Sequence, residues 1–151
     1  MATLEIHQVH APTSPPHSVR LSMALWLTAI GAGVAESVIG ASAAISSESG
    51  VTPALAAMIA FRVLLYGGLT MLVLRLRSGR NRVRIALTGL LGVIGLATLV
   101  IEPIKWLAAG AHWAEVDLDL YAGIRAIHIL AVLGALVALY RPASNRWFRR
   151  R

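Results

Sequence analysis

The sequence predicts an all-α integral membrane protein, an antiparallel four-helix bundle with both termini in the cytoplasm. Composition is the first reason: 57% of the 151 residues are hydrophobic, and the mean hydropathy of +0.70 exceeds that of water-soluble domains. The second is that four apolar segments are each long enough to cross a hydrocarbon core of about 30 Å. The third is that most Lys and Arg residues flank these segments on one side.

The apolar segments divide the chain into a leader, a membrane domain and a tail. Residues 1–19 contain three prolines and three histidines without apolar periodicity, which predicts a disordered cytoplasmic leader. We expect a membrane domain over 20–141, with spans at about 21–44, 53–76, 85–109 and 120–140, followed by a basic cytoplasmic tail over 142–151.

The first span has an alternative interpretation as a cleaved signal peptide. Ala41-Ser42-Ala43 resembles a small-residue cleavage site. The apolar run is longer than the hydrophobic core of most signal peptides, and it carries Glu36. Both features favour a membrane span.

The placement of the basic residues decides how the net charge of +7 is interpreted. Eleven of the fourteen Lys and Arg residues fall at Arg20, in the run 75–84, at Arg141 and in the tail, whereas the loops 45–52 and 112–119 have none. This is the positive-inside pattern of a plasma-membrane protein and favours anionic lipids over nucleic acid as the partner. The arginines expected to contact lipid headgroups are Arg75, Arg77, Arg80, Arg82, Arg84, Arg146, Arg149, Arg150 and Arg151.

Six ionisable residues lie inside the predicted spans and form the candidate polar cluster: Glu36, Arg62, Glu102, Lys105, Arg125 and His128. An unpaired charge at the centre of a span costs about 2.5–3.5 kcal/mol. Counting from the flanking arginines at about 1.5 Å per residue puts the two glutamates and two arginines at similar depths, about 20–27 Å from the basic side. Their signs alternate from span to span, so we expect Glu–Arg pairs between neighbouring helices.

Two interpretations of this layer stay open. The pairs either hold four helices in register and do nothing else, or they form a polar site, open to the outer side, for an ion, a proton or a small molecule. The near balance of charge favours the first. His128 is interpreted as a hydrogen-bonded core histidine, with a role in proton relay as the alternative.

No pattern in the sequence predicts an enzyme, a cofactor or a metal site. The chain has no cysteine, Gly-rich phosphate loop, Ser/His/Asp arrangement or zinc motif. The loop His112–Asp119 offers oxygen ligands for a divalent cation, but a solvated acidic loop is the simpler interpretation. The histidines of the leader lack anything that would fix ligand geometry.

A shift of 64 residues suggests an internal duplication. It aligns Leu72-Val73 with Leu136-Val137, Arg77 with Arg141, and Asn81-Arg82 with Asn145-Arg146. The bundle would then consist of two copies of a helical hairpin related by an axis along the membrane normal.

Three segments carry a family resemblance: Ser78–Arg84, Glu102–Trp106, and His128 through Arg141–Arg146. Through them the chain resembles small uncharacterised four-span membrane proteins of actinobacteria, of the mycobacterial type. The resemblance implies a plasma-membrane protein of a lipid-rich cell envelope with other envelope proteins as partners, and it brings no catalytic residues. In size, span count and the glutamate of its first span, Glu36, the chain is also similar to small multidrug transporters.

The function predicted from the sequence is that of a non-enzymatic accessory or scaffold protein of the cell envelope, held together by intramembrane Glu–Arg pairs. The alternative is a small proton- or ion-coupled transporter with a polar site in the outer half of the membrane. Expected partners are membrane lipids with anionic headgroups, and either other envelope membrane proteins or further copies of this chain.

Overall fold

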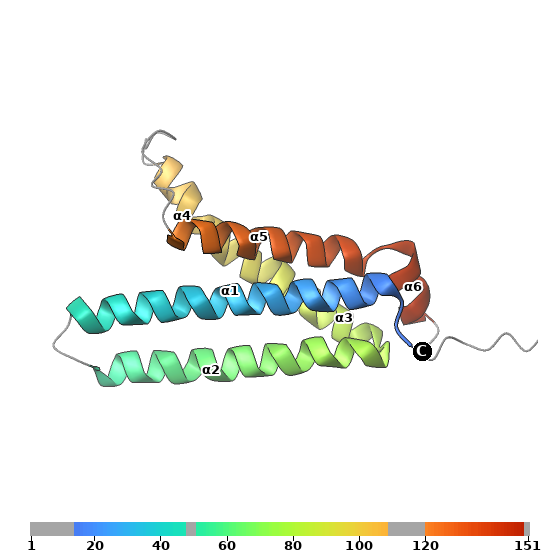
Figure 1. The fold of residues 1–151 in the computed structure, drawn as a ribbon, viewed down its shortest axis with the longest axis horizontal. Helices are drawn as coiled ribbons and strands as arrows, with labels where there is room; N and C mark the ends of the chain where they lie inside the picture. Colours follow the sequence, from blue (N-terminus) through green and yellow to red (C-terminus); the bar gives the residue numbers. More distant parts are fainter. Residues whose placement is uncertain (1–13, 48–50, 109–119, 150–151) are drawn as a thin grey trace, which may run out of the picture.

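The computed structural model describes residues 14–47, 51–108 and 120–149, which are almost entirely helical and contain no strand (Figure 1). This confirms the all-α prediction for the described part of the chain. The elements in order are α1 (His17–Ser47), α2 (Pro53–Leu74), the 3₁₀ turn η1 (Arg75–Ser78), α3 (Asn81–Leu87), the π-helical segment η2 (Thr88–Gly95), α4 (Leu96–Ala108), α5 (Leu120–Leu139) and α6 (Pro142–Arg149).

Four helical segments of the described chain are long and apolar enough to span a membrane, as predicted. They are His17–Ser47, Pro53–Ser78, Asn81–Ile101 and Leu120–Leu139. The first begins earlier than expected, so residues 17–19 belong to α1 and not to a disordered leader. Pro16 explains this start, because its carbonyl accepts hydrogen bonds from the backbone N–H groups of Val19 and Arg20. Residues 1–13 of the expected leader lie outside the described residues.

Local signals fix both ends of α2 and the turn after it. The Thr52 hydroxyl accepts a hydrogen bond from the Leu55 N–H at 3.2 Å, and Pro53 occupies the first turn, where its missing N–H costs nothing. After η1 the chain reverses at Gly79, whose φ of 69° lies in the left-handed region that favours glycine. The central arginine run is therefore a turn between two membrane-length helices.

The densest packing lies at the end of the bundle near this turn. α1 packs most extensively against α5, and the two helices lie side by side (Figure 1). Small residues such as Ala29, Ala131 and Ala135 are buried where the two helices meet, as expected for close helix contacts in lipid. The largest fully buried side chains are Trp26, Leu76, Leu87 and Leu139.

The segment η2 departs from the regular α-helix that the hydropathy pattern predicts. π-helical turns are wider than α-turns, and they recur at functional sites. Gly92 lies in this segment against α5, where a Cβ would come within 3.0 Å of a Leu136 methyl group. Beyond η2, α4 tilts away from α2 (Figure 1).

Arg84 differs from the other arginines expected at lipid headgroups because its side chain is only 8% exposed. Its Nη2 donates to Asn145 Oδ1 at 2.6 Å, and its guanidinium lies 3.9 Å from the centroid of the Tyr140 ring and 5.4 Å from that of Phe148. These contacts hold α3 to α6, so Arg84 is a packing residue. The positive-inside pattern places an arginine near the headgroups but does not indicate whether other parts of the protein bury it.

The remaining headgroup candidates are exposed where they are described. They are Arg75, Arg77, Arg80, Arg82, Arg146 and Arg149. Arg150 and Arg151 lie outside the described residues. The basic tail itself forms α6, which is docked through a hydrogen bond of 2.7 Å between the hydroxyls of Ser18 and Ser144.

Candidate functional site

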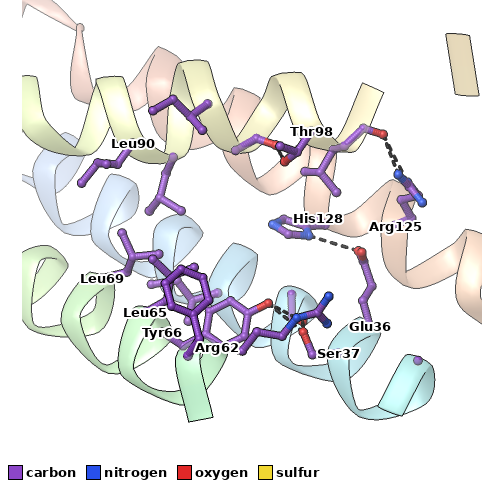
Figure 2. Close-up of a pocket in the computed structure, with 18 of the residues that line it drawn as sticks. Glu36, Ser37, Arg62, Leu65, Tyr66, Leu69, Leu90, Thr98, Arg125 and His128 are labelled. Carbon is purple, nitrogen blue, oxygen red and sulfur yellow. Dashed lines mark hydrogen bonds and ion pairs between the residues drawn. The ribbon is translucent and has the colours of Figure 1, made fainter. Parts of the chain in front are cut away.

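Glu36 on α1 and His128 on α5 meet across the interface between these helices. The Nδ1 atom of His128 lies 3.1 Å from Oε1 of Glu36, and the two side chains are only 14% and 13% exposed (Figure 2). The contact is a hydrogen bond between a carboxylate and an imidazole, and it becomes an ion pair only when His128 carries a proton on both ring nitrogens. The sequence predicts an arginine on a neighbouring helix as the partner of Glu36, and the structure shows a carboxylate–imidazole contact instead.

Gly33 explains why a histidine from α5 reaches Glu36. A Cβ at this position would lie 3.1 Å from Cε1 of His128 and 3.3 Å from Cε1 and the hydroxyl of Tyr66. Such distances are tighter than ordinary Cβ contacts, so a larger residue would require both rings to move by a few tenths of an ångström, and glycine lets them approach α1 at this level. Gly33 stands one turn before Glu36 and Ser37, and this places the imidazole within reach of the carboxylate.

Tyr66 is anchored to α1 by a compact set of hydrogen bonds. Its hydroxyl lies 2.9 Å from the Gly33 carbonyl oxygen and 2.8 Å from Oγ of Ser37, and Oγ of Ser37 lies 2.7 Å from the same carbonyl. Two hydroxyl protons are available for three contacts, so at least one proton is shared between two acceptors. The phenol is thereby fixed between α1 and α2 beside the Glu36–His128 pair (Figure 2).

Arg125 is bound to the backbone of α4. Its Nε and Nη2 donate to the Leu99 carbonyl at 3.2 and 2.9 Å, and its Nη1 lies 3.4 Å from the Tyr121 hydroxyl. In a regular α-helix the N–H of residue 103 would donate to the carbonyl of residue 99, but Pro103 has no N–H. Arg125 therefore supplies the donors that the proline removes from a carbonyl inside a membrane-length helix.

Arg62 on α2 has no hydrogen-bond or ion-pair partner in the described part of the chain. It lies on the same side of the site as Ser37 and Tyr66, opposite Arg125 (Figure 2). The guanidinium is partly buried but lines a hollow, so it is accessible to a ligand. Glu36 would be its natural counter-ion, and Glu36 is held by His128.

These side chains surround one cavity of about 660 Å³ between α1, α2, η2, α4 and α5. This volume is within the range of small-molecule pockets, about 300–1,000 Å³. Four of the six residues of the predicted polar cluster line it: Glu36, Arg62, Arg125 and His128. Much of the remaining wall is apolar, contributed by Phe61, Leu65, Leu69, Leu90, Leu91 and Ile94.

Lys105, a fifth member of the predicted cluster, is not among the described residues that line this cavity. Lys105 is exposed on α4, and the side chain of Glu102 lies outside the described residues, as does the acidic loop 112–119. The expected pairing of Glu102 with an arginine therefore stays a prediction. Among the described residues there is no group of three His, Asp or Glu side chains placed to hold a metal ion.

Sequence reasoning did not single out Tyr66, Ser37 or Tyr121. Their hydroxyls are a usable signal, because a phenol inside an apolar span needs a hydrogen-bond partner. Nothing in the sequence states which helix supplies that partner.

The charges of the cavity favour an anion. Two guanidinium groups face one carboxylate, and an imidazole stands beside that carboxylate, so the described lining carries an excess of positive charge. Arg62 offers free donors in a fork that matches a carboxylate or a phosphate. The Glu36–His128 contact joins two groups that both exchange protons.

Comparisons of the chain with family models, with curated proteins and with solved structures found no match.

Proposed function

We propose that this protein is a small ion- or proton-coupled carrier of the plasma membrane that binds an anionic ligand in the cavity of Glu36, Arg62, Arg125 and His128. The observation that carries the proposal is Arg62, a guanidinium without a protein partner in the described chain that faces a cavity of about 660 Å³. A lone charge at this depth in lipid costs about 2.5–3.5 kcal/mol, and a bound anion offsets that cost.

The topology belongs to the same proposal. We take the four membrane-length helices as an antiparallel bundle of two related hairpins, with both termini and the arginine turn in the cytoplasm. The exposed arginines at that turn support this orientation through the positive-inside rule. The cavity lies toward the ends of α1 and α2 remote from the turn, which corresponds to the outer half of the membrane.

Cysteine labelling tests the orientation. The chain has no cysteine, so Ser47→Cys at the exposed end of α1 and Ser78→Cys at the arginine turn are single reporters. We expect a membrane-impermeant maleimide added outside cells to label position 47 and not position 78. The reverse pattern would invert the topology and place the cavity in the inner half.

The Glu36–His128 pair supplies the coupling. A proton taken up by this pair lowers the negative charge of the cavity and so strengthens its attraction for an anion at Arg62. Loss of the proton restores the negative charge of the pair, which repels an anion in the same cavity. Binding of the proton and of the anion are thus mutually favourable, as symport requires.

Flux measurements in proteoliposomes test the carrier. We expect uptake of organic anions that rises with an inward proton gradient and is lost in Arg62→Gln. Arg77→Gln is the matched control, because it removes an exposed arginine outside the cavity. Wild-type flux equal to that of empty liposomes across carboxylates, phosphates and sulfonates would contradict the proposal.

A second candidate function, an accessory or scaffold protein of the cell envelope, is favoured by the apolar face of α2. Phe61, Leu64 and Met71 are large and exposed, and only Leu55, Leu69 and Val73 of this helix are buried. Such a face suits another membrane helix as well as lipid. Photo-crosslinking from position 64 in native membranes would yield a discrete protein adduct for a scaffold and only lipid adducts for a carrier working alone.

A further inference from the structure

A second hollow adjoins the polar cavity and differs from it in chemistry. It is a groove of about 520 Å³ between α1 and α2. Apolar side chains from both helices line most of it: Val34, Val38, Ala41, Ile45, Met58, Ile59 and Val63. Val38 and Val63 are 62% and 64% exposed, so the groove is open along the side of the bundle that meets the bilayer.

The groove and the cavity share a wall. Ser37, Met58, Arg62 and Tyr66 line both. Ser37 and Tyr66 are fixed by their hydrogen bonds to Gly33, whereas Arg62 has no described partner and methionine is intrinsically flexible. Arg62 thus stands at the junction between a polar cavity and an apolar groove.

We infer that the ligand is an amphipathic anion with a single acyl chain, a long-chain fatty carboxylate, which enters sideways from the bilayer between α1 and α2. Its chain would lie in the groove and its carboxylate would pair with Arg62 at the mouth of the cavity. This inference rests on the proposed anion-binding function and specifies its ligand class. A planar carboxylate matches the guanidinium fork through two parallel hydrogen bonds.

The two parts of the ligand contribute differently. Lipid tails are as apolar as the groove, so moving an acyl chain from bilayer to groove releases little free energy and serves mainly to set the position of the head. The charged pair forms in a medium of low dielectric constant and supplies the affinity. Binding should therefore depend strongly on the charge of the head and weakly on chain length.

Photo-labelling of the full chain in proteoliposomes tests the inference. The probe is a C16 fatty acid with a diazirine in its chain, and the adducts are mapped by mass spectrometry. We expect adducts on α1 and α2 within the groove, competed by unlabelled palmitate and not by palmityl alcohol. Adducts spread evenly over all lipid-facing helices, or equal competition by the alcohol, would overturn it.

Two pairs of variants sharpen the assignment. Arg62→Gln should lower competed labelling about tenfold, the effect of losing one charge-assisted pair, while Arg62→Lys retains much of it. Val63→Trp should block the groove, and Leu64→Trp is its control, because Leu64 is 76% exposed and lines neither hollow. If labelling is unchanged in Val63→Trp, where retained helicity and a monodisperse elution profile show a folded protein, the groove assignment is wrong.

Other ligands, tested by labelling and by flux, distinguish a failure of the fatty-carboxylate inference from a failure of the proposed anion carrier. Arg62-dependent flux of short, water-soluble anions without fatty-acid labelling would overturn the fatty-carboxylate assignment and leave the carrier standing. Competition by lysophosphatidic acid but not by palmitate would also overturn it, in favour of a phosphate head. If the wild-type protein shows no fatty-acid labelling and also no anion flux, both proposals are contradicted.

Discussion

Nδ1 of His128 stands 3.1 Å from Oε1 of Glu36, and this contact joins α5 to α1 above Gly33. It couples the two most extensively packed helices of the described chain at the level of the polar cavity. The contact also engages the carboxylate that lines the same cavity as Arg62. The contact between α1 and α5 and the proposed binding of an anion at Arg62 both depend on Glu36 pairing with His128 and not with Arg62.

A double-mutant cycle tests that selection. We expect Glu36→Gln and His128→Phe to be coupled by about 0.5–1.7 kcal/mol in the free energy of unfolding in mixed micelles, as for hydrogen bonds between membrane helices. The control is the cycle of Glu36→Gln with Arg62→Gln, which should show coupling close to zero. A larger coupling for the arginine pair would restore the Glu–Arg pairing predicted from the sequence.

Gly33→Ala should destabilise the protein by about 1–3 kcal/mol, the usual cost of overpacking a filled site. The added methyl would meet both the His128 and Tyr66 rings, neither of which is free to withdraw without losing hydrogen bonds. Gly31→Ala is the matched control, since its Cβ would meet nothing within 4 Å. Thermal unfolding followed by circular dichroism measures both, and equal melting temperatures would show that the close approach at Gly33 is unimportant.

The bond from Arg125 to the Leu99 carbonyl should depend on Pro103. In Pro103→Ala the new backbone N–H competes for that carbonyl, so Arg125→Gln should then cost less than in the wild type, by about 1 kcal/mol. Urea unfolding of the four proteins in the cycle measures the difference. Additive effects of the two substitutions would mean that Arg125 does not compensate for the proline.

Arg84→Lys should loosen the contact between α3 and α6. Lysine keeps the charge but loses the planar stacking on Tyr140 and the short bond to Asn145, and we expect a loss of about 1–2 kcal/mol. Arg82→Lys, at an exposed position, should be neutral. Limited trypsin digestion provides a local measurement, because undocking of α6 accelerates cleavage after Arg146; equal rates in the two variants would contradict the packing role.

The four spans were predictable to within a few residues at most ends because hydropathy and length alone determine them in lipid. The depth of each charge was equally accessible, since a helix rises by a fixed distance per residue, and Glu36, Arg62, Arg125 and His128 do line one cavity. Depth carries no information on the direction in which a side chain points around its helix. Whether Glu36 contacts His128 or Arg62 depends on that direction and on the close approach that Gly33 allows.

Two further features, the π-helical segment η2 and the burial of Arg84, depend on tertiary contacts that the hydropathy pattern of the sequence does not reveal. The π-helical turns of η2 change the face that follows Gly95, and a hydropathy window averages over such a change. Arg84 belongs by position to a solvated basic run, yet α6 folds over it. In both cases tertiary packing overrides what the neighbouring residues suggest.

The uneven packing of the bundle gives its two ends different local stabilities. Near the arginine turn, Trp26, Leu76, Leu87 and Leu139 are fully enclosed, whereas α2 beyond Leu69 toward its N-terminus is largely open. Backbone amides at the closed end should exchange hydrogen for deuterium only in global unfolding events, and those of 53–65 through much smaller fluctuations. We therefore expect the N-terminal half of α2 to separate from the bundle at a lower free energy than the rest of the described chain.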